Sequence, residues 1–495
     1  MSTASLASPG STALTLPDAR WLAAGVTILA VAGRFASGWI TPFGFDEAFS
    51  GVISSQPDVR TLISWCLNEI GGPVYYVLLW CWSHVFGTSL PALRGFSMMA
   101  SLATPLVILR WGHPDRVTRF YWAVMMALWL PAFGAATNGR CYALLMLETT
   151  AQAIAFRSFV VATDRRHAVA WVGLSVLAVL THYHAAILAG VQGLLILMLR
   201  PRAALRCWPA LLLLIPMAAW MAFHLSLLAR FATQGAWYAL LKPSDLVFVP
   251  ELIFGSIVLG AAAVLAAVVA LLHPRWHLGR LDRADVAVVL SGVMALAILL
   301  AIGMLRSSFT PRYTTIMGPA ILFGLAAWIR HAGRDMPLLP TIAVALFAAT
   351  AAGQIGRQIE DPVDDVRYNL NLGQPWAWLG EKHAHRVGFL WDSPTGRISE
   401  ASRIAEVIGF GPRQAGYPMA VTVLQDGRAR PSRIIHAAID ARRIDSLIWL
   451  ADQTVPGTLE RPDVAMLRRL GWSCRDFGGS HISMLTCRAG ARMTM

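Results

Sequence analysis

The most informative stretch of the chain reads Thr41-Pro42-Phe43-Gly44-Phe45-Asp46-Glu47-Ala48-Phe49-Ser50. It directly follows the apolar segment 20–40, so two adjacent carboxylates stand where a membrane helix would emerge into water. Carboxylates at that depth are costly unless they face a polar cavity and act there. Asp46 and Glu47 could instead simply cap the next helix. The side chains that the rest of the sequence places on the same side of the membrane favour an active site.

The composition is that of a polytopic membrane protein. Of 495 residues, 56% are hydrophobic and 14% are charged, and the mean hydropathy is +0.54, whereas soluble proteins carry about 25% charged residues. The net charge of +13 comes almost wholly from arginine, because Lys242 and Lys382 are the only lysines. The arginines gather in short loops between apolar segments, a distribution that sets orientation in a bilayer and argues against nucleic acid as a partner.

Spanning a bilayer takes about 20 mostly apolar residues. The candidate spans are 20–40, 93–110, 118–136, 139–157, 168–182, 184–200, 208–229, 250–272, 285–305, 312–331 and 337–355. Arginine clusters in alternate loops mark the cytoplasmic ends. With that orientation the apolar segment 72–90 cannot cross, so residues 57–90 are expected to hold two interfacial or re-entrant helices, the second opened by Pro73.

These spans predict three parts of the chain. Residues 1–19 are expected to form a disordered cytoplasmic tail. Residues 20–355 are expected to form a transmembrane domain of about 11 helices, with an outer loop at 41–92 that carries the juxtamembrane helices. Residues 356–495 are expected to lie outside the cytoplasm.

After Gln354 the composition changes to one rich in charge and turns. The short apolar runs 387–391, 420–424 and 446–450 alternate with helical patterns at 398–410, 434–444 and 459–471, which indicates a small α/β domain. Cys474 and Cys487 flank Gly478-Gly479 in a predicted hairpin. In an oxidising compartment these two cysteines could pair, and otherwise they are free thiols.

The predicted orientation gathers unusual polar side chains at the outer ends of the spans. They are Asp46, Glu47, Tyr75, Tyr76, Arg140, Tyr142, His182, His184, Lys242, Arg306, Arg312 and Tyr313. Each has an ordinary explanation: an interfacial arginine extends to lipid headgroups, tyrosines line the membrane interface, and two histidines alone do not complete a metal site. Their presence together on one side predicts a chamber for a negatively charged, lipid-linked substrate.

Several of these motifs, taken in order, resemble a known family. Besides Asp46-Glu47 they are Gly72-Pro73-Val74-Tyr75-Tyr76, Phe86-Gly87-Thr88-Ser89, Leu93-Arg94, Gly139-Arg140-Cys141-Tyr142, Thr181-His182-Tyr183 and Pro311-Arg312-Tyr313. The series is similar to the GT-C membrane glycosyltransferases of the protein O-mannosyltransferase and aminoarabinose transferase type, the family 39-like bacterial members. The resemblance covers roughly residues 20–355, and the C-terminal domain is similar in kind.

The resemblance implies an inverting transferase in the bacterial inner membrane that takes a sugar from a polyprenyl-phosphate donor to an envelope acceptor on the outer face. In that family the carboxylate after the first helix acts near the acceptor, which corresponds to Asp46, with Glu47 beside it. Relatives often carry His or Lys before a double proline where this chain has Gly71-Gly72-Pro73. The cation for the donor phosphate would then come from Arg140, Lys242 or Arg312.

The residue types suit this chemistry. A carboxylate can take the proton of a hydroxyl acceptor, and arginines can hold the departing lipid phosphate. No cofactor is required, although Asp46 and Glu47 could hold a divalent cation through oxygen ligands. Two alternatives stay open: a transporter or flippase of lipid-linked sugars, which would more often show internal repeats and broken helices, and an inactive relative that assists envelope polysaccharide assembly.

Overall fold

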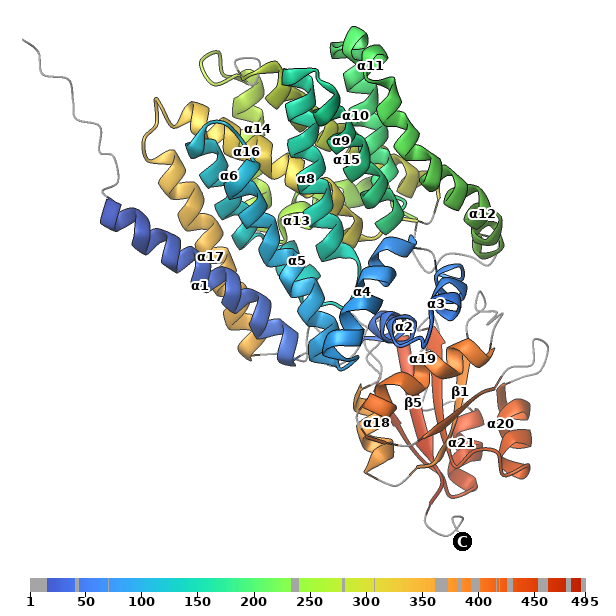
Figure 1. Cartoon of the computed structure of the whole chain (residues 1–495). Coiled ribbons are helices and arrows are strands. Elements are labelled where there is room, and N and C mark those ends of the chain that lie inside the picture. The colour runs from blue at the N-terminus through green and yellow to red at the C-terminus, as the bar shows by residue number, and fades with distance from the viewer. Residues whose placement is uncertain are drawn as a thin grey trace, which may run out of the picture.

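The computed structural model describes residues 16–40, 44–69, 71–232, 240–277, 281–306, 308–360, 373–381, 384–392, 401–414, 416–417, 419–424, 431–452, 462–477 and 482–490. Most of the predicted N-terminal tail and the predicted Gly478-Gly479 turn lie outside these ranges. The chain forms a helical bundle with a small α/β domain at one end of it (Figure 1). The predicted fold class, a helical membrane protein with a C-terminal α/β domain, is confirmed.

Every predicted span contains helix. The bundle consists of α1 (Leu16–Ile40), α5 (Leu90–Trp111), α6 (Arg116–Leu128), α7 (Leu130–Ala136), α8 (Tyr142–Ala162), α9 (Arg165–Thr181), α10 (Ala185–Leu199), α11 (Pro201–Arg206), η1 (Trp208–Leu213), α12 (Leu214–Ala232), η2 (Pro243–Phe248), α13 (Val249–Phe254), α14 (Ile257–Leu272), α15 (Arg283–Leu305), η4 (Pro311–Ile316), α16 (Gly318–Ala332) and α17 (Leu339–Glu360). Figure 1 shows α1 and α17 side by side along one edge of the bundle.

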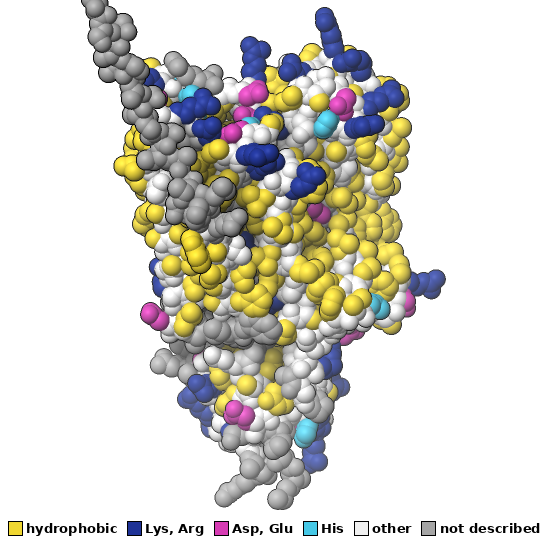
Figure 2. Space-filling model, turned by 60° about the vertical axis from the view of Figure 1, so that its left-hand side comes forward, with side chains coloured by type: hydrophobic (Ala, Val, Ile, Leu, Met, Phe, Trp, Pro, Cys, Tyr) yellow, Lys and Arg dark blue, Asp and Glu magenta, His cyan; other side chains and the backbone are white. Residues whose placement is uncertain are grey.

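Five of the described helices are long and apolar enough to cross a membrane, or six if the bent pair α13–α14 is one span. Two shorter apolar helices cover Trp21–Ala36 and Ala185–Leu199. The expected number of about 11 crossings therefore stays a prediction. Figure 2 shows a broad band of hydrophobic side chains across the visible face of the bundle, with many Lys and Arg side chains at the end farthest from the α/β domain.

Two of the predicted spans are broken by identifiable residues. The predicted span 118–136 breaks at Trp129, between α6 and α7, because Pro131 has no N–H to continue the α-helical ladder. The carbonyl of Ala127, which loses that donor, accepts a hydrogen bond of 2.8 Å from Nη1 of the fully buried Arg34. The predicted span 250–272 bends by 101° between α13 and α14, where Gly255 takes a left-handed φ of 71°.

Three short helices follow α1 where the outer loop was expected. They are α2 (Phe45–Ser54), α3 (Val59–Cys66) and α4 (Pro73–Phe86). Asp58 caps α3 by accepting a hydrogen bond from the Thr61 backbone N–H, and Pro73 occupies the first turn of α4 as predicted. These helices lie at the end of the bundle that meets the α/β domain (Figure 1).

The α/β domain has the strands that the sequence predicts and helices that overlap the three predicted ones, together with one helix, α18, that was not predicted. Its sheet contains β1 (Arg386–Asp392), β2 (Ala420–Val423), β3 (Ser446–Asp452), β4 (Ser473–Asp476) and β5 (Ile482–Arg488) in the order β2-β1-β3-β5-β4. Its helices are α18 (Gly373–Gly380), α19 (Ala401–Gln414), α20 (Pro431–Asp440) and α21 (Pro462–Arg469). Strand β1 pairs parallel with β2 and β3, and β5 pairs antiparallel with β3 and β4. Cys474 and Cys487 face each other across β4 and β5 and form a disulfide.

Helix α19 attaches this domain to the membrane end of the chain. It packs against α2, where Gly51 leaves space for the ring of Phe410 because a Cβ there would stand 2.2 Å from that ring. Arg403 donates to Ser64 at 3.2 Å and stacks over the Trp65 ring on α3. The α/β domain thus contacts the short helices that carry the candidate site.

Candidate active site

Glu47 is a buried structural carboxylate. It is 3% exposed, and both of its oxygens bind the guanidinium of Arg94 on α5, at 2.8 and 2.6 Å. The same oxygens accept the backbone N–H groups of Gly44, which closes the first turn of α2, and of Gly139, which fixes the loop before α8. The helix-capping explanation considered for this stretch therefore applies to Glu47.

Asp46 has different surroundings. Its side chain is 46% exposed, and Oδ2 accepts a hydrogen bond of 2.7 Å from Nη1 of Arg312, which lies in η4. Desolvation opposes its ionisation, but the positive charges of Arg140 and Arg312 outweigh that effect and lower the pKa of Asp46 below its usual value. Asp46 is consequently an ionised, accessible carboxylate at neutral pH.

Arg140 lies at the centre of the site, in the turn between α7 and α8. Its guanidinium donates to the Tyr76 hydroxyl at 3.1 Å, to Glu69 at 3.0 Å and to the backbone carbonyl of Asp46 at 3.3 Å. The Arg140 and Glu69 side chains are each 14% exposed. Arg140 thereby ties α2, the end of α3 and α4 to the bundle, and Tyr75 packs edge-on against Tyr76 beneath it.

A wall of aromatic and imidazole rings adjoins the ion pairs. The ring of Tyr313, the residue after Arg312, stacks on His184 at 4.2 Å and lies 4.9 Å from His182. His182 in turn lies 5.9 Å from the ring of Tyr142. Burial lowers the pKa of His182 to about 3 and that of His184 to about 4, so both imidazoles are neutral at physiological pH. This wall therefore adds no charge beside the ion pairs.

The structure thus brings together the predicted site residues except two. Lys242 directly precedes η2 and Arg306 follows α15, and both are exposed. Within the described part of the chain neither side chain forms a hydrogen bond or ion pair with the other predicted residues. Their loops are nevertheless adjacent, since the Leu241 N–H donates to the Gly303 carbonyl at 3.1 Å.

Gly72 packs closely against the end of α9, whereas Gly71, which stands where relatives carry the cation, has room for a Cβ because the nearest atoms would lie 3.8 Å from it. A Cβ on Gly72 would stand 1.8 Å from the Leu180 carbonyl oxygen, so only glycine fits against the end of α9. The connection that carries His182 and His184 therefore packs directly on the Gly71-Gly72 turn. Arg140 and Arg312 are the cations that the structure places beside Asp46.

The sequence-based list omitted Glu69 and Arg94. Both are ion-pair partners of predicted residues, Glu69 with Arg140 and Arg94 with Glu47. Arg94 stood within a motif of the resemblance, whereas no spacing near Glu69 distinguishes it from an ordinary interfacial acid. Among the described residues no group of three His, Cys, Asp or Glu side chains could hold a metal ion, and Asp46 and Glu47 each bind arginine. The divalent cation considered for them remains a prediction.

Comparisons with solved structures show a GT-C-like fold. The crystal structure of ArnT from Cupriavidus metallidurans in the apo state matches with a TM-score of 0.55 and 13% identity, over 95% of this chain and 99% of that one. The same protein bound to undecaprenyl phosphate matches with a TM-score of 0.54 and 13% identity, over 95% and 98%. The Archaeoglobus fulgidus oligosaccharyltransferase in complex with zinc and sulfate gives a TM-score of 0.43 and 12% identity, over 93% and 72%.

No protein-family model matches the sequence, and no curated protein matches it.

Proposed function

We propose that this protein is an inverting glycosyltransferase that moves a sugar from a polyprenyl-phosphate donor to an acceptor in the bacterial cell envelope. The observation that carries the proposal is the accessible Asp46 carboxylate held 2.7 Å from Arg312, with Arg140 beside it. A base and a phosphate-binding cation in contact are the two groups that a single displacement at a sugar phosphate requires. The fold shared with ArnT, which binds undecaprenyl phosphate in one of its crystal structures, supports this donor class.

The two arginines have different roles in this proposal. The guanidinium of Arg140 already donates hydrogen bonds to Tyr76, Glu69 and the Asp46 backbone carbonyl. It therefore positions α2 and adds positive charge near the donor phosphate without binding it directly. Arg312 is 38% exposed and has Asp46 as its partner, so it can turn to a phosphate oxygen. Binding of the donor phosphate would then compete with Asp46 for Arg312 and release the carboxylate for the acceptor.

The reaction follows from that exchange. Asp46 accepts the proton of the acceptor hydroxyl as its oxygen forms a bond to the anomeric carbon of the sugar. The bond between that carbon and the phosphate oxygen breaks, and its electron pair stays on the polyprenyl phosphate. Arg312 stabilises the charge that develops on the departing phosphate. Attack from the face opposite the leaving group inverts the anomeric centre, and Glu47 takes no part beyond fixing α2.

A transporter of lipid-linked sugars is the competing function. To separate the two, we would incubate the purified protein in nanodiscs with a panel of polyprenyl-phosphate sugars, with and without an extract of envelope acceptors. A transferase releases polyprenyl phosphate and yields a glycosylated product only when the extract is present. A transporter leaves every donor intact in both arms but moves it between leaflets when the protein is reconstituted in liposomes. Donors that stay intact in both arms and also stay in their original leaflet in liposomes would instead favour a non-catalytic assembly partner.

A further inference from the structure

Helix α3 is short, and its last carbonyl groups need partners from outside the helix. It has eight residues, and an isolated helix of that length is marginal in water. Asp58 caps its first turn. At its other end the backbone N–H of Asn68 donates to the Trp65 carbonyl at 3.0 Å, so it does not continue the helix to the Ser64 carbonyl. The last carbonyls of a helix carry partial negative charge, which a cation can satisfy.

That cation comes from the α/β domain. Arg403 on α19 donates from Nη1 to the Ser64 carbonyl and from Nη2 to the Ser64 hydroxyl, each at 3.2 Å. Its guanidinium also lies over the Trp65 ring, 4.9 Å from the ring centroid, which adds a cation–π attraction. The side-chain amide of Asn68 donates to the same Ser64 carbonyl at 2.8 Å. Arg403 therefore caps the C-terminal end of α3 from a position 339 residues away in the sequence.

The capped end of α3 leads directly to the candidate active site. Glu69 follows Cys66, the last residue of α3, by three positions, and its N–H donates to the Cys66 carbonyl at 3.3 Å. The Glu69 carboxylate accepts from Nη2 of Arg140 at 3.0 Å, while Nη1 of Arg140 donates to the Asp46 backbone carbonyl. The point at which α3 ends thus determines where Glu69 lies, and Glu69 determines how Arg140 is oriented.

Displacement of Glu69 would change the surroundings of the base. Although desolvation opposes the effect, the positive charge of Arg140 helps to lower the pKa of Asp46. Without Glu69 as its partner, the Arg140 guanidinium is free to pair with the Asp46 carboxylate itself. A carboxylate in such a pair is a weaker base, because the pairing stabilises its ionised form.

We propose that Arg403 is a positioning residue, which caps α3 from the α/β domain and so holds Glu69 where it keeps Arg140 in the orientation that the reaction needs. The inference rests on the proposed transferase function, since it assigns a further residue to that site. It gives the α/β domain a role in assembling the site.

Hydrogen–deuterium exchange of the full-length protein in nanodiscs tests the first step, because it needs no turnover. Arg403→Gln removes the charge and the two-pronged donor, and we expect the backbone amides of residues 59–69 to exchange about fivefold faster. Arg403→Lys keeps a cation at the end of α3, so its exchange should stay within about twofold of wild type.

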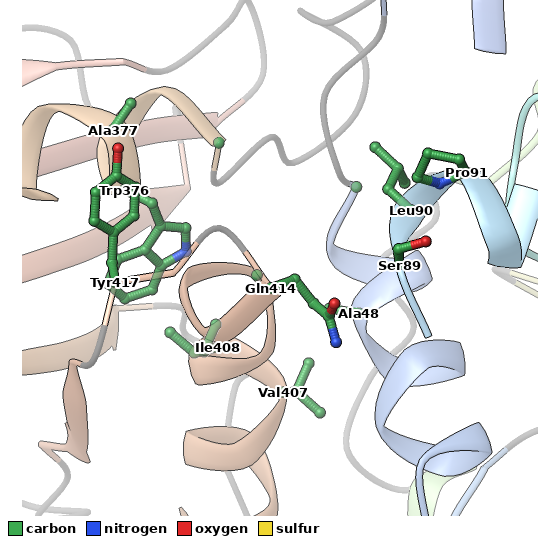
Figure 3. A pocket seen from close by; sticks show the side chains of 13 residues that line it. Ala48, Ser89, Leu90, Pro91, Trp376, Ala377, Val407, Ile408, Gln414 and Tyr417 are labelled. Atoms are coloured by element: carbon green, nitrogen blue, oxygen red, sulfur yellow. The ribbon is translucent and has the colours of Figure 1, made fainter. Parts of the chain in front are cut away.

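Gln414 is the matched control, because it joins the same helix, α19, to the residues before α5. Its side-chain amide donates to the Thr88 hydroxyl at 2.9 Å, and Figure 3 shows it extending from α19 toward Ala48 and Ser89. Gln414→Ala should leave the exchange of α3 as it is in wild type. Equal acceleration in Gln414→Ala and Arg403→Gln would mean that any loosened contact of the domain exposes α3, and it would overturn the role of Arg403.

Turnover tests whether Arg403 acts through Glu69. Glu69→Gln keeps an acceptor oxygen for Arg140, so it should slow the release of polyprenyl phosphate without abolishing it. We expect Arg403→Gln to lower kcat about tenfold, since small misplacements of reacting groups are costly, and to leave KM for the donor unchanged. The double variant should be no slower than the slower single variant, because residues in one network are not additive. Losses that multiply would show that Arg403 acts independently of Glu69.

The two measurements separate the positioning role from the transferase function. If Arg403→Gln leaves the exchange of α3 unchanged, the proposal is overturned whether or not the protein turns over. If wild type releases no polyprenyl phosphate while Arg403→Gln still exposes α3, the transferase function fails, whereas the cap on α3 is supported.

Discussion

Asp46 and Glu47 are adjacent in the sequence and opposite in their surroundings. Glu47 is 3% exposed and has its acceptor sites filled by Arg94, Gly44 and Gly139. The Asp46 side chain is 46% exposed, and its ion-pair partner among the described residues is Arg312. The sequence could mark the two carboxylates as unusual, but it could not show which one is structural and which one is accessible. Successive side chains on a helix face different neighbours, and only the fold shows which ones.

Substitution of Arg312 tests whether this residue binds the donor phosphate. Arg312→Gln removes the charge that would bind the phosphate, and we expect donor affinity to fall about tenfold or more, because hydrogen bonds to charged groups contribute about 1.5–3 kcal/mol. Folding should change little, since both members of the Asp46 pair are partly exposed. Undecaprenyl phosphate binding by isothermal titration would measure this. Wild-type affinity in Arg312→Gln would rule out this residue as the phosphate ligand.

The two histidines predict a dependence of stability on pH. Their folded pKa values of about 3 and about 4 lie below the ordinary value of 6.5. As the pH is lowered, these histidines therefore take up protons in the unfolded chain before they do so in the folded one. Their full contribution to the free energy of unfolding is present above pH 6.5 and declines as the pH falls toward 4. Thermal unfolding between pH 7.5 and 4.5 should show this decline in wild type and a smaller one in a His182→Gln, His184→Gln double variant. Parallel curves would show that the two rings do not titrate in that range.

At the scale of elements, local chemistry predicted most helices and strands well. Pro73 opens α4, and the apolar runs 387–391, 420–424 and 446–450 lie in or overlap β1, β2 and β3. Hydropathy did not predict the breaks at Trp129 and Gly255, because a run of apolar residues has the same mean hydropathy whether its helix is straight or bent. The buried Arg34, which satisfies the Ala127 carbonyl at one break, was likewise not foreseen.

The ion pair of Glu47 with Arg94 holds α2 to α5. Both side chains are 5% exposed or less, and removing one partner of such a pair costs about 3–5 kcal/mol, because the other charge is left buried. Glu47→Gln should therefore lower the denaturation midpoint strongly, whereas Asp46→Asn should shift stability by about 1 kcal/mol at most. A double variant, Glu47→Leu with Arg94→Met, should recover part of the loss. Equal stability of Glu47→Gln and Asp46→Asn would contradict the structural role.

At the scale of the whole molecule, the α/β domain and the arginine-rich loops lie at opposite ends of the apolar belt (Figures 1 and 2). By the positive-inside rule this arrangement supports a cytoplasmic position for the loops and an extracytoplasmic one for the domain. The Cys474–Cys487 disulfide is consistent with an oxidising compartment. The hydrophobic pattern of the sequence cannot predict how the α/β domain packs on the helical bundle. That packing depends on contacts of α19 with α2 and α3, which are far apart in the sequence.

Thiol labelling tests that orientation. In a Cys81→Ser background, which removes the exposed native thiol, Arg433→Cys places a probe on exposed α20 and Ala162→Cys places one at the opposite end, on α8. A membrane-impermeant maleimide added to intact spheroplasts should label the first and not the second. In permeabilised spheroplasts the maleimide should label both cysteines. Labelling of Ala162→Cys alone in intact spheroplasts would invert the topology and put the site in the cytoplasm.

The central claim is that Asp46 is the base of a transfer reaction. The measurement is single-turnover release of polyprenyl phosphate by wild type and Asp46→Asn in nanodiscs, with a donor and acceptor that wild type uses and donor binding determined on the same samples. We predict that Asp46→Asn folds, binds the donor and releases polyprenyl phosphate about 10²–10⁴ times more slowly. Release at the wild-type rate by a folded, donor-binding Asp46→Asn would contradict the claim.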